Sequence, residues 1–336
     1  MVLREFNQPL REEDVPLPAI GSGDLLIKVQ GCGVCYTDIK IASGFFTYIT
    51  LPRIMGHEIA GVVARKGEGV KNFREGDRVC IYFYLNCGQC ENCREHKENL
   101  CLNLRGRIGF HFDGGYAEYV KVPASHAFMV PPNIPMEEAA ILADAVATPL
   151  HALREQAKVQ PGETVAIFGV GGLGIHAVQL ARLLGLRVLA IDLDEKKLQA
   201  ARELGAETFS GADGGLRESV LSSTGGKGVD VVLDIVGKNE TFQTSLSFLK
   251  AAGRYVIVGY SFEKPFTVSP HTILTNEFVL IGSRASRPCE LADVLQWAAD
   301  KKIKPMVSQR IPLNQANLVL ERLKRNEIFH RVVLRP

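Results

Sequence analysis

A glycine-rich turn between a buried strand and a helix constrains the fold of this chain more than any other feature. The segment 164–169, "TVAIFG", has the continuous apolar character of a buried strand, and 173–185, "LGIHAVQLARLLG", is typical of a helix. Gly169, Gly171 and Gly174 form G-x-G-x-x-G between them. The first glycine permits a tight turn, the second lets backbone approach a pyrophosphate, and the third allows close helix–strand packing. This arrangement predicts a dinucleotide-binding site.

The next predicted strand ends at a carboxylate. Asp192 follows Gly174 by 18 residues, where it can bind both ribose hydroxyls and repel a 2′-phosphate. We therefore expect NAD rather than NADP, although nearby Lys196 and Lys197 leave NADP open. The alternative is a glycine-rich turn that binds nothing. The candidate cofactor-binding residues of this segment are Gly169, Gly171, Gly172, Leu173, Gly174, Asp192 and Lys197.

The two halves of the chain differ in their pattern of predicted strands and helices. Up to about residue 145, short strand-like runs such as 24–34 are separated by Gly, Pro and Asp, which predicts a barrel-like β-rich unit. Beyond 163, strands alternate with helices, as at 187–192 and 194–205, which predicts a doubly wound parallel sheet. A length of 336 residues also favours two domains over a single core. The expected fold class is therefore α/β plus β.

Four of the eight cysteines fall within fifteen residues, spaced C-x2-C-x2-C-x7-C. These are Cys87, Cys90, Cys93 and Cys101. Four thiolates on a polar loop are typical of a closed tetrahedral zinc site that has a structural role. An iron–sulfur cluster is disfavoured by the seven-residue spacing and the lack of a Cys-Pro end. Disulfides are disfavoured because the N-terminus has no apolar export segment.

A second set of donors is dispersed along the chain. Cys35 in "GVCYTD" and His57 in "GHEIAG" could be two ligands of a catalytic zinc, which needs three protein ligands and one open position. Glu58 is a further candidate ligand. The spacing alone leaves open that Cys35 and His57 are unrelated buried residues. Asp144, in "ILADAVATP", has a local pattern that favours a capping or turn residue.

Taken together, these motifs resemble those of the zinc-containing alcohol dehydrogenases of the medium-chain dehydrogenase/reductase superfamily. "GVCYTD", "GHEIAG", the four cysteines, "GDRV", "GGYAEYV" and "GVGGLG" occur in the same order, and the resemblance covers essentially the whole chain. It implies a GroES-like catalytic domain at 1–147 with a C-terminal return at 298–336. It also implies a Rossmann NAD-binding domain at 148–297.

The resemblance implies a role for each matching residue. Cys35 and His57 match the first two ligands of the catalytic zinc, and Asp144 matches the third. The family usually has cysteine at that third position, but some relatives have aspartate. Glu58 matches an acidic residue that can join the zinc or exchange with its bound water. Thr37 matches the hydroxyl that contacts the substrate alcohol.

Two further positions depart from the family pattern. Lys40 stands where a relay histidine is usual, and lysine is a poor base at neutral pH unless it is desolvated. The last proton step would then go to water. Arg331 matches an arginine near the cofactor pyrophosphate, but His330 replaces the glycine that usually precedes it.

The predicted function is a zinc-dependent NAD(H) oxidoreductase that interconverts an alcohol with an aldehyde or ketone, with one catalytic and one structural zinc per chain. The alternatives are a polyol or amino-alcohol dehydrogenase, a zinc-free enoyl or quinone reductase, and a non-catalytic binding protein. Mixed charge with a formal net of +2 suggests neither a nucleic-acid nor a membrane partner. We expect a cytoplasmic homodimer or homotetramer that pairs through an edge strand at 277–283.

Overall fold

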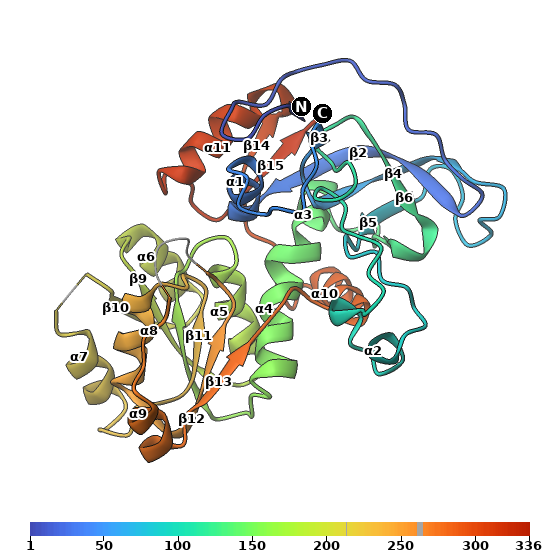
Figure 1. Ribbon diagram of the computed structural model, residues 1–336. Helices are drawn as coiled ribbons and strands as arrows, with labels where there is room; N and C mark the ends of the chain where they lie inside the picture. Colours follow the sequence, from blue (N-terminus) through green and yellow to red (C-terminus); the bar gives the residue numbers. More distant parts are fainter. Residues whose placement is uncertain (213, 261–264) are drawn as a thin grey trace. The chain divides into compact units, whose positions relative to one another are not determined.

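The computed structural model describes residues 1–212, 214–260 and 265–336 (Figure 1). The chain forms two compact units, one of Met1–Ala147 with Ser286–Pro336 and the other of Thr148–Ala285. The chain re-enters the first unit at Ser286, whereas the sequence placed this return at residue 298. Helix α10 (Pro288–Ala299) explains the difference, because its buried apolar side chains pack against the turn Leu142–Val146 of the first unit.

The first unit is built on a seven-stranded sheet. Its order is β14-β15-β2-β4-β5-β7, with β6 paired to β2 off this path. The strands are β2 (Asp24–Val34), β4 (Glu58–Lys66), β5 (Arg78–Ile81), β6 (Tyr119–Pro123), β7 (Ala127–Met129), β14 (Val307–Pro312) and β15 (Arg331–Arg335). A separate pair joins β1 (Val2–Leu3) to β3 (Arg53–Ile54). The predicted β-rich character of this unit is confirmed.

Strand register places the candidate site in this unit. Strand β2 is antiparallel to both β4 and β15, with Gly33 opposite both Glu58 and Val333. The end of β2 therefore adjoins the start of β4 and the start of β15. As a result, the residues Cys35, Glu58 and Arg331, far apart in the sequence, come to one end of the sheet.

Short helices complete the first unit. They are α1 (Tyr36–Ala42), α2 (Glu91–Arg94), α3 (Met136–Ile141), α10 and α11 (Ala316–Lys324). Helix α3 packs across β2 and β4 and leads into the turn Leu142–Val146. The chain remains helical through α4 (Ala147–His151) and a further wide turn, Ala152–Gln156.

The second unit is a six-stranded, fully parallel sheet in the order β10-β9-β8-β11-β12-β13 (Figure 1). The strands are β8 (Thr164–Phe168), β9 (Arg187–Asp192), β10 (Glu207–Ser210), β11 (Val229–Asp234), β12 (Leu249–Ile257) and β13 (Val279–Gly282). The helices are α5 (Gly174–Leu183), α6 (Glu195–Glu203), α7 (Leu216–Ser223), α8 (Asn239–Leu246) and α9 (Pro270–Asn276). Strand order reverses beside β8, which is the switch point where doubly wound sheets bind ligands. The predicted doubly wound parallel sheet is confirmed.

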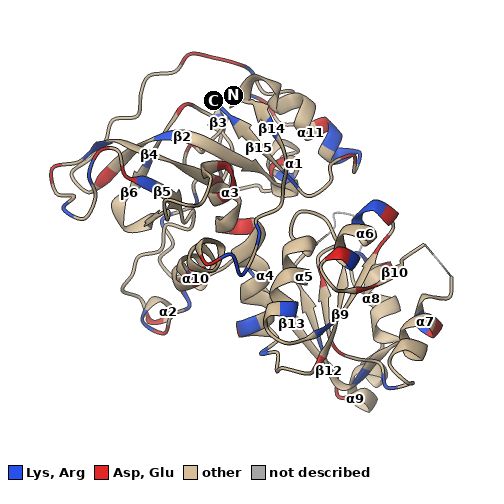
Figure 2. Ribbon diagram, turned by 180° about the vertical axis from the view of Figure 1, so that it is seen from behind, with Lys and Arg blue, Asp and Glu red and all other residues tan. Residues whose placement is uncertain are grey.

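No helix in the described parts of the chain is long and apolar enough to cross a membrane. Figure 2 shows Lys and Arg interspersed with Asp and Glu along elements such as α6.

Candidate active site and metal centres

Three donors of different chemistry meet in the first unit. The ligand atoms of Cys35, His57 and Asp144 all lie within 4.8 Å of one another. Asp144 Oδ2 is 3.6 Å from Cys35 Sγ and 3.6 Å from His57 Nε2. Around a tetrahedral zinc, bonds of about 2.0–2.3 Å separate neighbouring ligand atoms by roughly 3.3–3.8 Å. The spacing and the sulfur, nitrogen and oxygen donors therefore fit zinc, with three protein ligands rather than four.

A wide helical turn brings Asp144 to this group. Leu142–Val146 has π-helical geometry, and the residues on both sides of it keep right-handed helical backbone angles. Asp144 thus lies inside a helical segment and is not the N-cap residue that its local pattern favoured. Single π-helical turns widen a helix and occur often at functional sites.

Asp38 lies behind His57. Its Oδ1 is 3.5 Å from His57 Nδ1, while its Oδ2 accepts hydrogen bonds from the Cys35 backbone N–H and the Tyr116 hydroxyl, both at 2.9 Å. Burial opposes a charge on His57, but the nearby carboxylates of Asp38 and Asp144 raise its pKa well above the usual value. Asp38 thus orients the imidazole whose other nitrogen faces the donor group.

Glu58 and Arg331 form a buried ion pair next to the donors. Arg331 Nη2 lies 2.5 Å from Glu58 Oε1 and 3.3 Å from Asp144 Oδ2, and the Ala145 backbone N–H donates to Glu58 at 3.1 Å. Burial raises the pKa of Glu58 to about 7 against the opposing charge of Arg331. A Cβ at Gly33 would lie 1.8 Å from the Glu58 carboxylate, so only glycine leaves room for this side chain.

These contacts bear on two predicted roles. Glu58 is outside the group of three donors and is held by Arg331 instead. The Arg331 guanidinium is buried and directed at two carboxylates of the first unit. Its predicted contact with a cofactor pyrophosphate therefore stays a prediction, as does the predicted bond of Glu58 to metal.

Helix α1 carries the candidate proton-transfer residues. Thr37 is partly exposed in the first turn, two residues after Cys35. Lys40 is buried one turn further on, with its Nζ 5.9 Å from the centre of the Tyr36 ring. Burial lowers the pKa of Lys40 to about 8. Burial thus shifts the pKa of Lys40 in the direction that favours a base, and its role as proton acceptor stays a prediction.

The four clustered cysteines form a second metal-binding group. Their sulfur atoms also lie within 4.8 Å of one another, with Cys90 Sγ 3.5 Å from Cys93 Sγ and 3.8 Å from Cys101 Sγ. Zinc–sulfur bonds of about 2.3 Å put tetrahedral sulfur neighbours roughly 3.8 Å apart. None of the eight cysteines, all of which the structure describes, forms a disulfide, so the disulfide alternative is wrong. The arrangement is a closed four-sulfur site.

The predicted cofactor loop lies between β8 and α5 in the second unit. Gly169 has a φ of +87°, which side-chain-bearing residues rarely adopt, and a Cβ at Gly174 would lie 1.8 Å from the Gly169 carbonyl oxygen. A Cβ at Gly171 would meet nothing within 4 Å, so the loop backbone is open on that side. The arrangement fits a pyrophosphate against the N-terminus of α5.

Asp192 is tied to this loop. Its Oδ2 accepts the Val170 backbone N–H at 2.7 Å, so the carboxylate at the end of β9 is held against the loop. Gly172 and Leu173 complete the loop, and the Gly172 carbonyl accepts a hydrogen bond from His176 Nδ1 at 2.7 Å. Lys197 lies in the first turns of α6, which begins three residues after Asp192.

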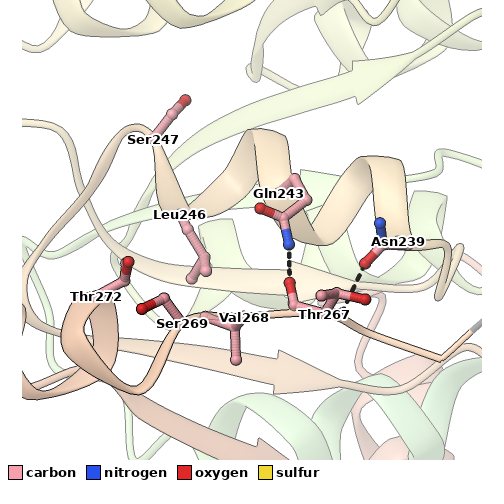
Figure 3. A pocket seen from close by; sticks show the side chains of 8 residues that line it. All are labelled: Asn239, Gln243, Leu246, Ser247, Thr267, Val268, Ser269 and Thr272. Atoms are coloured by element: carbon pink, nitrogen blue, oxygen red, sulfur yellow. Dashed lines mark hydrogen bonds between the residues drawn. The ribbon is translucent and has the colours of Figure 1, made fainter.

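A hollow of about 720 Å³ lies elsewhere in the second unit, between α8 and the segment before α9 (Figure 3). Figure 3 shows Gln243 and Asn239 on α8 bonded to the backbone of Thr267. The lining is Asn239, Gln243, Leu246, Ser247, Thr267, Val268, Ser269 and Thr272. None of these side chains titrates near neutral pH, so this hollow offers no side-chain acid or base for catalysis.

Comparisons with known proteins show the family to which the chain belongs. Residues 21–132 match the family model of the alcohol dehydrogenase GroES-like domain, and residues 172–300 match that of the zinc-binding dehydrogenases. An alcohol dehydrogenase of Geobacillus stearothermophilus is 36% identical over 99% of this chain and 98% of its own length. The chain belongs to the zinc-binding alcohol dehydrogenase family.

Two further relatives match the full length of this chain. An NAD-dependent alcohol dehydrogenase of Sulfolobus acidocaldarius is 35% identical over 100% of this chain and 98% of its own. The crystal structure of the alcohol dehydrogenase from Aeropyrum pernix superposes with a TM-score of 0.93 at 34% identity, covering 100% of this chain and 99% of that one.

Sequence reasoning missed a group that supports the four-cysteine site of this dehydrogenase. Asn86 Nδ2 donates to Cys93 Sγ at 3.8 Å, and its Oδ1 lies 3.1 Å from His126 Nε2. Because Asn86 Oδ1 only accepts, His126 Nε2 carries the proton and Nδ1 accepts from Ser125 Oγ at 2.9 Å. The position of Asn86 beside Cys87 was visible in the sequence, but nothing there linked it to His126. Asp38 was visible as part of "GVCYTD", three residues after Cys35.

Proposed function

We propose that Cys35, His57 and Asp144 hold the catalytic zinc of this dehydrogenase. The observation that carries the proposal is the meeting of three unlike donors, two of them buried, at distances that fit tetrahedral zinc. A catalytic zinc keeps one position open for substrate, and this group supplies three protein ligands. The protein is an NAD(H)-dependent oxidoreductase that interconverts an alcohol with an aldehyde or ketone.

The bound zinc supplies Lewis-acid polarisation of the substrate oxygen, and the nicotinamide supplies hydride chemistry. Within the chain, Asp38 holds the His57 ring in the orientation that directs Nε2 at the donor group. Arg331 balances part of the negative charge that Glu58 and Asp144 bring into a buried region. These residues position the ligands and do not themselves react.

The Thr37 hydroxyl, partly exposed two residues after Cys35, accepts the proton of the substrate hydroxyl as it gives up its own proton. Lys40 then accepts the proton, because a lysine with a pKa of about 8 is partly neutral at physiological pH. Transfer to water instead of Lys40 is the alternative.

The four-cysteine group holds a structural zinc. All four sulfur ligands come from one short segment, and backbone N–H groups donate to the sulfur atoms, as Cys90 N does to Cys87 Sγ at 3.3 Å. A site filled by four protein ligands leaves no position for substrate. It therefore stabilises the loop from Cys87 to Cys101 and takes no part in the reaction.

The second unit binds NAD through the loop Gly169–Gly174 and Asp192. The Asp192 carboxylate, held by the Val170 N–H, faces the region where a ribose would lie and disfavours a 2′-phosphate. Lys197 contacts the cofactor from α6.

A second copy of the chain pairs with strand β13. This strand lies at one end of the six-stranded sheet, and Val279 and Leu280 are 46% and 40% exposed on it. Exposed apolar edge strands are prone to pair with another chain. Light scattering coupled to size exclusion should give a dimer or tetramer, and Leu280→Lys should shift it toward monomer. A wild-type monomer at micromolar concentration would contradict this assignment.

Metal analysis combined with turnover assays tests the proposed function. We expect two zinc atoms per chain and formation of NADH, in preference to NADPH, across a panel of primary, secondary and polyhydroxylated alcohols. Preference for polyols or amino alcohols would assign the protein to that branch of the family. One zinc per chain with reduction of enones or quinones, and no alcohol turnover, would instead support a zinc-free reductase.

A further inference from the structure

Aromatic rings continue outward from the catalytic donor group. The His57 ring lies 4.9 Å from the centre of Phe83 and 5.4 Å from that of Phe110. Phe110 in turn lies 5.9 Å from Phe46, which contacts Phe45 at 5.1 Å. One face of the metal-ligating imidazole therefore borders a continuous aromatic surface.

This aromatic surface reaches solvent within the first unit. Phe45 and Tyr48 are 42% and 44% exposed, and Tyr48 stacks on His111 with ring centres 4.9 Å apart. Contiguous exposed apolar side chains on a soluble protein mark binding surfaces more often than chance. A surface of rings that begins at a zinc ligand and ends at solvent favours an aromatic substrate over a short aliphatic one.

Arg107 places a cation on this surface. Its guanidinium carbon lies 4.2 Å from the ring centre of Phe110, 5.1 Å from Tyr48 and 5.5 Å from Tyr84. Nη2 donates to the Tyr48 hydroxyl, whereas the buried Nε has no hydrogen-bond partner. No ion pair joins Arg107 to a carboxylate in the part of the chain that the structure describes.

Such a guanidinium can bind an anion. It is half-buried between aromatic rings, and a cation without a counter-charge gains from a carboxylate that accepts two parallel N–H bonds. The contacts of Phe110 with both groups put the guanidinium carbon within about 10 Å of the centre of the His57 ring. This span is comparable to the length of a para-substituted phenyl group.

We propose that Arg107 is a specificity-determining residue, and that the substrates of this dehydrogenase are alcohols or carbonyls whose aromatic body carries a carboxylate. The proposal rests on the zinc-centre function proposed above, because the distance from Arg107 matters only if the reaction occurs beside His57. Arg107 contributes binding and orientation and takes no part in hydride transfer.

The test compares 4-(1-hydroxyethyl)benzoate with its methyl ester as substrates for NAD reduction. The wild-type protein should have a kcat/KM at least tenfold higher for the acid. Arg107→Met should reduce this acid-to-ester ratio at least tenfold, and Arg107→Lys should give an intermediate ratio. Arg105→Met is the matched control, because it removes the same charge from an exposed position nearby and should keep the wild-type ratio.

Three results would overturn the proposal. A wild-type protein that oxidises the ester as well as the acid rules it out, whatever the variants do or whether they fold. An unchanged ratio in folded Arg107→Met with a lowered melting temperature would make Arg107 a structural clamp between Tyr48 and Phe110. Failure to oxidise any alcohol of the wider panel would remove the proposed dehydrogenase function itself, which the first two results leave standing.

Discussion

The two metal-binding groups of the first unit differ in where their zinc ligands come from and in which donor atoms they use. The four-cysteine group takes identical donors from one fifteen-residue segment on a partly exposed loop. The group of Cys35, His57 and Asp144 takes three unlike donors from positions up to 109 residues apart. These donors lie next to the buried ion pair of Glu58 and Arg331. A closed local site can stabilise a loop, whereas a site with an open position needs the whole fold to hold its ligands apart.

The largest effect on folding should come from a substitution in the four-cysteine group. Cys90→Ser removes one of four sulfur ligands, and loss of a structural metal costs several kcal/mol of folding free energy. We expect one zinc fewer per chain and a melting temperature lower by about 10 °C. Cys289→Ser, at an exposed thiol outside both groups, is the control. An unchanged melting temperature in zinc-depleted Cys90→Ser would show that this site does not stabilise the fold.

The next effect should come from low pH, which should lower the stability that His126 contributes beside the four-cysteine site. Burial lowers the pKa of His126 to about 4, against about 6.5 in the unfolded chain. The unfolded state therefore binds the extra proton first, and stability is present above pH 6.5 and lost as pH falls toward 4.

Urea unfolding across this range should show the loss. His126→Phe should lower the pH-dependent loss between pH 6.5 and 4 by about 3 kcal/mol relative to wild type. His271→Phe, at an exposed histidine of α9, should leave the loss unchanged. Parallel curves for wild type and His126→Phe would mean that His126 does not titrate on unfolding.

The role of Asp38 in orienting His57 should be visible in the rate at which the zinc held by Cys35, His57 and Asp144 is released. Asp38→Asn removes the charge facing His57 Nδ1, and loss of such an outer partner typically costs 10–100-fold in metal affinity or activity. We expect one of two zincs to transfer to a chelator 10–100-fold faster and kcat/KM to fall to a similar extent. Asp300→Asn, at an exposed site, should change neither. Faster release of both zincs would point to general destabilisation instead of a positioning role for Asp38.

Proton transfer should show the smallest effect. If Lys40 accepts the proton, kcat/KM for alcohol oxidation rises with pH through about 8, because deprotonated lysine is the active form. Lys40→Gln should lower kcat/KM about tenfold at pH 9 and flatten the rise near pH 8. An identical pH profile in Lys40→Gln would assign the final proton acceptor to water.

The difference between the sites also explains what the sequence could predict. The four cysteines were found by spacing, since every donor is local, and the glycine loop was found because the strand and helix around it are regular. Asp144 was assigned only by family resemblance, because its local pattern favours a cap and nothing local encodes the wide turn Leu142–Val146.

Contacts between residues far apart in the sequence could not be predicted from local sequence patterns alone. Arg331 and Glu58 are 273 positions apart and meet only through the register of β15, β2 and β4. The burial of Lys40 and the stacking of Arg107 on Phe110 likewise depend on packing between segments whose separate sequences carry no sign of it.

The central claim is that the carboxylate of Asp144 holds the catalytic zinc. Zinc content and alcohol turnover of purified Asp144→Ala test it most directly, with melting temperature as the check on folding. We predict one zinc per chain instead of two, retained in the four-cysteine group, a melting temperature close to wild type, and turnover reduced by at least a thousandfold. Two zincs per chain with near-normal turnover in this variant would contradict the account.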